Sequence, residues 1–373
     1  SSGSASGTSS AAAGNASEEA IAARTEPVKL TMCFMNFIGA QDATNDVVEE
    51  MNKITREKLG IEIELQILDS ASYKQQMTLM LSGGEQVDLF NAISVGYSNC
   101  INNGYVIDLE EDGLIQTYGQ GIIDAMGQKY IDACRFGGTL YGVPQQRDMA
   151  IGMNAYAIGS QYLDGIGFEY TGDNINQVTA EQIEDILAQL HEKYPDKAVI
   201  GPQTATLSQS VKYDSIGGDN FGVLLDPENS LEVGDLFSSG LYKDFCQKWY
   251  DWNQKGYLSG DALTNDVAAT TQVRSGTLLG YQTATKPGIR VQESNLCGQP
   301  MVILQEGEDF LKAGAVASMP WCISLNTVDQ VAAMQYLNEL YTNPELSTLL
   351  CWGREGVEYQ KTDDGHLTYA DGV

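Results

Sequence analysis

The segment IEIELQIL (residues 61–68) decides the fold class of this 373-residue chain. Leucine or isoleucine stands at every second position with Glu or Gln between, which is the period of a half-buried β-strand. The run VKLTMCFMNF (28–37) predicts an earlier, buried strand. Residues 43–59 have helical spacing, and Gly60 is placed to end the helix. Strand, helix and strand in this order predict a βαβ unit with a right-handed crossover.

The α/β pattern continues along the chain. Ser72 with Gln75, and Thr179 with Gln182, each have the spacing of a helix-capping box. Further predicted elements are a long amphipathic helix at 241–256, a buried strand at 277–283 and a helix at 327–341. Two α/β blocks with a late return predict two lobes joined by more than one chain crossing. A cleft between lobes is a favoured place for a small-molecule site.

The first 28 residues predict a flexible tether ahead of the folded protein. In SSGSASGTSSAAAGNAS (1–17), every residue except Thr8 and Asn15 is Ser, Ala or Gly. Such a stretch has no large apolar side chain to bury, so burial cannot offset its ordering entropy. A leader of this kind suggests a protein held near a surface by its N-terminus. The alternative is a disordered remnant of an expression tag.

The net charge of -29, from 21 basic and 50 acidic residues, restricts the partners. Such a surface repels phosphate backbones and anionic lipid head groups, so we expect no nucleic-acid binding and no direct membrane binding. No apolar run approaches the ~20 residues that span a bilayer. A body held off a membrane by a tether is therefore favoured.

The seven cysteines predict reduced, structural thiols. Their number is odd and no CxxC pair exists, although zinc sites usually show closer pairing. Cys33, Cys322 and Cys351 have apolar neighbours, which suits small buried hydrophobic residues. We therefore expect no metal site.

The sequence contains no recognisable catalytic motif. The two histidines, His191 and His366, fall on a polar helix face and in a polar tail. No HExxH, GxSxG or GxxxxGK[ST] motif is present. A carboxylate pair of the glycosidase kind stays possible, because fifty acidic residues offer many pairs. The pattern favours binding over catalysis, without a cofactor.

Six stretches, taken together and in order, are specific enough to indicate a family. They are YKQQMTLMLSGGEQVDLF (73–90), GGTLYGVPQQRD (137–148), YDSIGGDNFGV (213–223), KWYDWNQKGYLSGDA (248–262), TKPG (285–288) and YLNELYTNPELSTLLCWGREGVEY (336–359). With them the chain resembles the extracellular solute-binding lipoproteins of Gram-positive ABC importers, which are relatives of maltodextrin-binding proteins. The resemblance runs from about residue 29 to 360 and is greatest to the branch associated with complex-carbohydrate uptake.

The resemblance implies an α/β, two-lobed fold of the periplasmic-binding-protein type, with hinge crossings and a central ligand cleft. Carried over by position, 1–28 is the disordered tether and 29–146 is the first part of lobe 1. Lobe 2 is 147–318, and 319–362 is the return to lobe 1. The tail, 363–373, ends before the further lobe 2 helices that relatives usually have.

The resemblance also implies a function. We expect the substrate-binding component of an ABC transporter, not an enzyme, that captures a carbohydrate outside the membrane and delivers it to the permease by lobe closure. The ligand is expected to be an oligosaccharide. The protein is expected to be a monomer on the outer face of the cell membrane, anchored through an N-terminal lipid-modified cysteine that is absent from this chain.

Ligands in open α/β sheets meet loops at the carboxyl ends of strands. The predicted ligand-binding residues are Asn36, Phe37, Asn91, Ser94, Tyr97, Gln145, Arg147, Asp148, Tyr213, Asp214, Gln282, Lys286 and Trp321. Gln145, Arg147 and Asp148 have the planar groups that bind sugar hydroxyls in pairs. Trp321 could form the platform for an apolar sugar face.

Structural roles compete with these assignments. Phe37 suits the core as well as the site, and Arg147 with Asp148 could form a structural ion pair. Trp249 and Trp252 are predicted to pack a helix. Two alternative functions also stay open. One is a hydrolase or lyase acting on polysaccharide, and the other is the same receptor binding a peptide or an acidic sugar through Lys286 and Arg147.

Overall fold

The computed structural model describes residues 6–36, 44–70, 72–201, 207–215, 221–262, 264–265, 267–362 and 365–370. The chain divides into two compact units. Unit 1 comprises Ser1–Gln146 and Val316–Val373, and unit 2 comprises Arg147–Ala315. Within the described residues, every helix is too short or too polar to cross a membrane.

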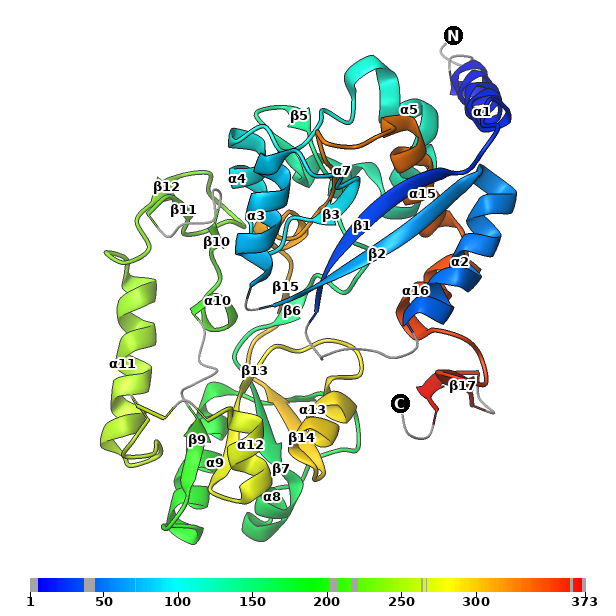
Figure 1. The fold of residues 1–373 in the computed structure, drawn as a ribbon. Helices are drawn as coiled ribbons and strands as arrows, with labels where there is room; N and C mark the ends of the chain where they lie inside the picture. Colours follow the sequence, from blue (N-terminus) through cyan, green and yellow to red (C-terminus); the bar gives the residue numbers. More distant parts are fainter. Residues whose placement is uncertain are drawn as a thin grey trace. The chain divides into compact units, whose positions relative to one another are not determined.

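Unit 1 is built on a four-stranded sheet in the order β16-β3-β1-β2 (Figure 1). Its strands are β1 (Val28–Asn36), β2 (Ile61–Asp69), β3 (Leu89–Asn91) and β16 (Trp321–Ile323). Strand β1 is parallel to β2 and β3, and β16 is antiparallel to β3. The predicted βαβ unit is present, with α2 (Thr44–Leu59) between β1 and β2.

Helices cover both faces of this sheet. Helix α2 packs on β2 and contacts α15 and α16, and α3 lies on the other side beside β3 and α4 (Figure 1). The remaining helices of unit 1 are α3 (Tyr73–Gly83), α4 (Tyr97–Asn102), α5 (Leu114–Tyr118), α6 (Gln120–Met126), α7 (Gln128–Ala133), α15 (Gln330–Thr342) and α16 (Pro344–Trp352). Two short hairpins, β4 (Arg135–Phe136) with β5 (Thr139–Leu140) and β17 (Tyr359–Lys361) with β18 (Leu367–Tyr369), complete the unit.

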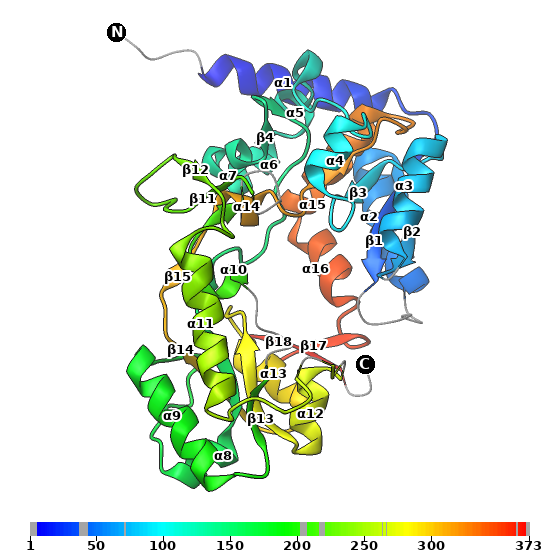
Figure 2. The same ribbon diagram turned by 90° about the vertical axis from the view of Figure 1, so that its left-hand side faces the viewer.

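The N-terminal segment differs from the predicted tether, because Ser6–Ala22 forms helix α1. Alanine has the highest helix propensity, and the segment is rich in it. Tertiary contacts add to this preference, since the buried Gln335 amide donates to Ser17 Oγ at 2.8 Å and accepts from Arg24 Nη2 at 2.6 Å. Figure 2 shows α1 lying along α5.

The two predicted capping boxes have different outcomes. Thr179 Oγ1 accepts from Gln182 N and the Gln182 side chain accepts from Thr179 N, so this box is confirmed. Ser72 makes no capping bond, because its backbone is already helical (φ -105°, ψ -8°). Its hydroxyl instead accepts from the Gln76 amide at 2.8 Å, so the predicted box with Gln75 is wrong.

Unit 2 is built on a five-stranded sheet in the order β8-β14-β7-β13-β9. Its strands are β7 (Ala155–Gly159), β8 (Asn176–Gln177), β9 (Ala198–Gly201), β13 (Leu278–Thr283) and β14 (Met301–Gln305). Strand β7 is antiparallel to both neighbours, whereas β13 is parallel to β9 and β14 is parallel to β8. The smaller strands are β6 (Ile151–Gly152), which pairs with β15 (Asp309–Phe310), and the sheet of β10 (Asp214–Ser215), β11 (Val223–Leu224) and β12 (Val233–Gly234).

Two layers of helices pack on the unit 2 sheet (Figure 2), and each encloses an apolar cluster. One layer carries α8 (Ser160–Ile166), α9 (Ala180–Lys193) and α11 (Gly240–Gln254), and the other carries α12 (Ala269–Ser275) and α13 (Ile289–Cys297). Two four-residue helices, α10 (Leu207–Ser210) and α14 (Ala313–Val316), lie outside these layers. Trp252 is fully buried and Trp249 packs beside it at a ring distance of 5.0 Å, so the predicted packing role of both is confirmed.

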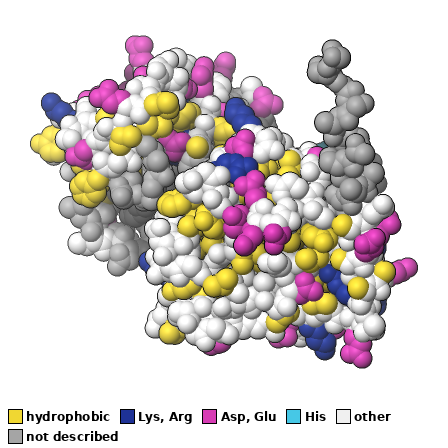
Figure 3. Space-filling model, turned by 90° about the horizontal axis from the view of Figure 1, so that it is seen from above, with side chains coloured by type: hydrophobic (Ala, Val, Ile, Leu, Met, Phe, Trp, Pro, Cys, Tyr) yellow, Lys and Arg dark blue, Asp and Glu magenta, His cyan; other side chains and the backbone are white. Residues whose placement is uncertain are grey.

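Five of the seven thiols are buried and none forms a disulfide. Cys33 and Cys322 lie in the unit 1 core as predicted, but Cys351 is exposed on α16. Its apolar neighbours in sequence, Leu349 and Leu350, are themselves only half-buried, so the local composition overstated its burial. Seen from above, acidic side chains are spread over the visible face with few basic ones between them (Figure 3).

Candidate functional site

Three predicted ligand residues lie at the edge of the unit 1 sheet that is formed by the carboxyl ends of its parallel strands. Asn36 ends β1 and Asn91 ends β3, and these strands are parallel, so both residues reach the same edge. Strand β16 runs the other way, so its first residue, Trp321, also lies there and is paired with Asn91. We name this the aromatic edge, defined by Phe34, Asn36, Asn91, Ser94 and Trp321.

The aromatic edge contains a pair of rings. Phe34 and Trp321 pack edge to face, with ring centroids 5.1 Å apart. Phe34 is half-buried and Trp321 is 9% exposed. The Trp321 backbone is fixed by two hydrogen bonds with Val143, each 2.9 Å long. The two strands therefore hold the ring pair at a defined place.

Sequence reasoning selected Phe37 and missed Phe34. Phe37 lies outside the described residues. The signal for Phe34 was available, because alternate residues of a strand share a face and Phe34 follows the buried Leu30 and Met32 at steps of two. A residue on that face near the carboxyl end of the strand combines core packing with access to the edge.

Asn91 uses its side chain inside the fold. Its amide donates to Met319 O at 2.7 Å, and its Oδ1 accepts from Ile93 N at 3.0 Å. Its backbone carbonyl accepts from the Tyr73 hydroxyl at 2.8 Å. With 5% of the residue exposed, Asn91 shapes the aromatic edge more than it offers free hydrogen-bonding groups.

Ser94 is the exposed polar residue of the aromatic edge. Its backbone has a φ of +61°, which lies in the left-handed region that residues with a β-carbon rarely adopt. Its hydroxyl lies 3.7 Å from Met35 Sδ, beside the end of β1. Asn36, which follows Met35 in the chain, is half-buried. Backbone strain at a strand end often accompanies a binding role.

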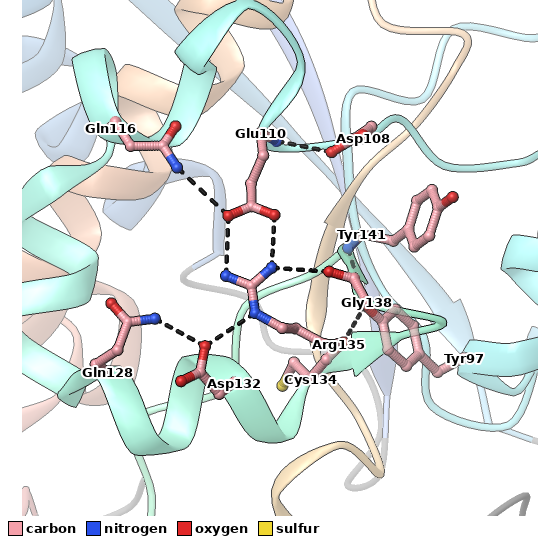
Figure 4. A network of polar contacts seen from close by, with 10 residues as sticks. All are labelled: Tyr97, Asp108, Glu110, Gln116, Gln128, Asp132, Cys134, Arg135, Gly138 and Tyr141. Carbon is pink, nitrogen blue, oxygen red and sulfur yellow. Dashed lines mark hydrogen bonds and ion pairs between the residues drawn. The ribbon is translucent and has the colours of Figure 1, made fainter.

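Tyr97 uses its hydroxyl for hydrogen bonds within the fold. Its hydroxyl donates to Cys134 O at 2.8 Å and accepts from Tyr141 N at 3.1 Å (Figure 4). Burial raises the pKa of this hydroxyl well above its ordinary value. The same region is fastened by the guanidinium of Arg135, which binds both carboxylate oxygens of Glu110 and lowers the pKa of that carboxyl (Figure 4).

The three residues predicted at the first crossing differ in their surroundings. Gln145 is half-buried, whereas Arg147 and Asp148 are exposed. The Arg147 guanidinium donates to Ala315 O at 2.9 Å and to the Asp148 carbonyl at 3.3 Å. These bonds go to backbone oxygens, so the guanidinium holds two chain segments together, and burial lowers its pKa from the ordinary value.

Tyr213 and Asp214 are built into unit 2. Tyr213 is buried in a small apolar cluster with Val223, and burial raises its pKa. The Asp214 carboxylate, 6% exposed, accepts from Ala313 N at 2.8 Å and from Gly314 N at 3.0 Å. It therefore caps the turn of α14.

The remaining predicted residues of unit 2 lie at and beyond the end of β13. Gln282 is 1% exposed and its amide donates to Ser210 Oγ at 2.7 Å. Lys286 is exposed in the loop that follows, and its carbonyl accepts from the Asn174 amide at 2.9 Å. The Lys286 side chain thus offers an exposed cationic group at this end of β13.

A buried polar network that sequence reasoning missed closes the same edge of unit 2. Thr285 Oγ1 accepts from Gly152 N and donates to Gln305 Oε1, each at 2.7 Å. The Gln305 amide donates to Gly307 O at 2.7 Å. A Cβ on Gly152 would meet Gln305 Oε1 at 1.9 Å, so only glycine fits. No local sequence pattern predicts these contacts, because the partners are far apart in the chain.

The side chains in the described part of the chain include no cluster of three or more His, Cys, Asp or Glu that could hold a metal ion. The described side-chain groups of the aromatic edge are two rings, two amides and a hydroxyl. Such groups bind neutral hydroxylated molecules by stacking and hydrogen bonding.

Comparisons with known proteins agree with these features. A curated relative, a carbohydrate ABC transporter substrate-binding protein of Streptococcus pneumoniae, is 25% identical over 330 residues. The match covers 86% of this chain, which spans 64% of the length of that relative. No model of a known protein family matches the chain.

Solved structures share the fold. The N-glycan transport solute binding protein NgtS of Streptococcus pneumoniae matches with a TM-score of 0.78 at 22% identity, over 93% of this chain and 74% of that one. The same protein in complex with Man5GlcNAc matches with a TM-score of 0.69 at 22% identity, with the same coverage. This chain therefore has the mixed α/β fold of the solute-binding proteins, as the sequence predicts, and it is similar in sequence to a carbohydrate ABC transporter substrate-binding protein.

Proposed function

We propose that this chain is the substrate-binding component of an ABC importer that captures an oligosaccharide and releases it unaltered. The observation that carries the proposal is the Phe34–Trp321 ring pair at the carboxyl edge of the unit 1 sheet. The similarity to a named carbohydrate substrate-binding protein supports it.

The chemistry of the aromatic edge suits a sugar. The carbon–hydrogen face of a pyranose packs on aromatic rings, and the ring hydroxyls need donors and acceptors beside it. Trp321 and Phe34 supply the rings, and Ser94 supplies an exposed hydroxyl next to them. Asn36 and Gln145 stay predicted ligand residues on the same unit.

The wider biological setting is part of the same proposal. We propose that the two units correspond to the two lobes of the predicted fold and that they close on the ligand. Unit 2 ends at Ala315, whereas the predicted lobe 2 ends at residue 318. A ligand that binds the closed form better than the open form shifts the population toward the closed form. The closed form then docks on a membrane permease. The protein acts as a monomer on the outer face of the membrane, held by an N-terminal lipid anchor.

A thermal-shift screen tests the proposal. Man1GlcNAc and Man5GlcNAc, the glycans bound to NgtS in its solved complexes, are the first probes, and sucrose at equal concentration controls for solvent effects. A specific ligand at a hundred times its Kd stabilises the folded state by about 2.7 kcal/mol. A rise in Tm with glycan and none with sucrose is expected. A broad glycan panel that gives no rise contradicts the proposal.

The same panel separates the alternatives. A polysaccharide hydrolase or lyase changes the mass of its glycan, so mass spectrometry of the recovered sugar distinguishes turnover from capture. A uronate oligosaccharide and an acidic peptide are included because Lys286 is exposed and cationic. A shift with those two probes alone would redirect the proposal to an acidic ligand.

A further inference from the structure

The two places where the chain passes between units are fastened on the unit 1 side. At the first crossing, Val143 pairs with Trp321, and Pro144 O accepts from the Tyr341 hydroxyl at 2.6 Å. At the second crossing, the Asn91 amide donates to Met319 O at 2.7 Å, and Ala92 N donates to Pro320 O at 3.1 Å. Side-chain and backbone bonds therefore fix the chain up to residue 144 and again from residue 319.

The unit 2 side of the crossings is fastened as well. The Arg147 guanidinium, at the start of unit 2, donates to Ala315 O, at its end, with a bond of 2.9 Å. A few residues farther on, strands β6 and β15 pair antiparallel, with Ile151 opposite Phe310. The two segments that leave unit 2 are thus joined to each other.

The Asp214 carboxylate holds the second of these segments from another direction. Its two oxygens accept from Ala313 N and Gly314 N, and a Cβ on Gly314 would meet Asp214 Oδ1 at 2.7 Å. The close approach requires glycine at position 314. An almost fully buried carboxylate that binds two backbone amides costs free energy when it is removed, because the amides lose their acceptor.

Two reciprocal cation–π contacts reinforce the same junction. The Lys212 ammonium lies 5.5 Å from the centre of the Phe310 ring. The Lys312 ammonium lies 4.8 Å from the centre of the Tyr213 ring. Each of the two segments, 212–214 and 310–314, therefore supplies one ammonium group and one aromatic ring to the other.

We propose that Asn91, Arg147 and Asp214 are positioning residues that fasten the ends of the two crossings. Their bonds then shorten the part of each crossing in which bending between the units can occur. The three residues set how far the units move and do not select the sugar. The ligand-dependent part of this inference rests on the proposed function, whereas the bending itself is measurable without ligand.

The chain carries its own labelling sites for the test. Cys246 in unit 2 and Cys351 in unit 1 are exposed, and the other five thiols are buried. Nitroxide labels on these two residues of the full chain give an inter-unit distance distribution by pulsed electron paramagnetic resonance. We expect Arg147→Gln and Asp214→Asn each to shift the mean distance or to split the wild-type peak. Distributions that coincide with the wild type in both variants overturn the proposal.

Matched controls separate the crossings from general loosening of unit 2. The Arg274 guanidinium also donates to a backbone carbonyl, that of Leu296, but between α12 and α13. Asp235 also accepts from a backbone amide, Phe237 N, at 3.0 Å. Arg274→Gln and Asp235→Asn should keep the wild-type distribution, and an equal change in these controls overturns the assignment. If the Asp214→Asn variant fails to fold, the Arg147→Gln variant decides the outcome, because Arg147 is exposed.

A ligand arm distinguishes positioning from contact. For a positioning residue, Asp214→Asn lowers the affinities for the short and the long glycan of the panel by the same factor, up to about fivefold, which corresponds to about 1 kcal/mol. A change in the ratio of the two affinities means that Asp214 contacts sugar, and it overturns the proposal. Failure of the wild type to bind any glycan contradicts the proposed function, and the distance measurement then decides the positioning proposal by itself.

Discussion

The two units finish the carboxyl edges of their sheets in different ways. Unit 1 ends in two aromatic rings, Phe34 and Trp321, with the exposed hydroxyl of Ser94 beside them. Unit 2 ends in a buried network in which Thr285 and Gln305 bind each other and the backbone. Both edges occupy the place where α/β folds bind ligands.

The difference indicates that the two units contribute differently to ligand binding. A buried polar group that is already bonded gains little from a ligand, because a new bond must replace an old one. The half-buried Phe34 ring, packed against Trp321, keeps surface that a sugar can cover. Unit 1 therefore provides the recognition surface in our account, and unit 2 provides a rigid frame around Lys286.

The largest expected effect on glycan affinity comes from removing the larger ring. Trp321→Leu should lower the affinity about tenfold, because it removes the ring that packs on Phe34, and an aromatic contact contributes up to about 1.5 kcal/mol. Isothermal titration with Man5GlcNAc measures the loss. Trp249→Leu, which changes a tryptophan of α11 in unit 2, should leave the affinity unchanged. Equal losses in both variants would remove the distinction between the units.

A glycine substitution tests the rigid frame of unit 2. Gly152→Ala should lower the free energy of unfolding by about 2 kcal/mol, since the added Cβ would overlap Gln305 Oε1 and Thr285 Oγ1. Gly172→Ala is the matched control, because no atom lies within 4 Å of its added Cβ. Denaturant unfolding compares the two variants. A Gly152→Ala protein as stable as the control would show that the network yields easily.

The pH dependence of stability should distinguish the cores. Burial raises the pKa of the unit 1 thiols Cys33, Cys100 and Cys134 to about 12, from 9.0 in the unfolded chain. The unfolded state thus releases these protons first, so folding stability is kept below pH 9 and falls as the pH rises toward 12. Denaturant midpoints measured from pH 8 upward check this.

A triple Cys→Ser or Cys→Ala replacement in unit 1 provides the comparison for the alkaline loss. Removal of the three thiols should flatten the decline attributed to them, even where it lowers stability at neutral pH by leaving cavities. An unchanged alkaline slope in the replaced protein would assign the loss to other groups. Unit 2 contributes fewer such thiols, since Cys297 is its buried one.

The smallest expected effect is at the strained residue of the aromatic edge. Ser94→Gly relieves a φ of +61°, but it also loosens the unfolded chain, so the net gain in stability should stay below about 1 kcal/mol. Thermal unfolding measures the gain, and titration with glycan shows whether the hydroxyl is used. A clear loss of stability would indicate that the Ser94 hydroxyl holds the turn.

The sequence predicted the framework well because its signals are local. Alternation over 61–68 and the apolar run at 28–37 are sufficient for β1 and β2, and the Thr179–Gln182 spacing is sufficient for a cap. Helix α1 was not predicted, since its docking on the distant Gln335 joins segments that local composition treats separately.

The site was harder to predict for the same reason. The Asn91 amide is used by Met319 and the Asp214 carboxylate by Ala313, and both partners lie far along the chain. Residue type and strand position could place these side chains at a sheet edge. They could not show that the polar atoms already had partners within the fold. Phe34 was missed because ligand sites are expected in the loop after a strand, whereas Phe34 lies within β1.

A crystal structure of the chain with Man5GlcNAc tests the central claim most directly. Our account predicts an intact glycan with one pyranose ring packed on the Phe34–Trp321 ring pair and hydroxyls within hydrogen-bond distance of Asn36 or Ser94 of the aromatic edge. A glycan bound away from the unit 1 sheet edge, or found cleaved, would contradict it.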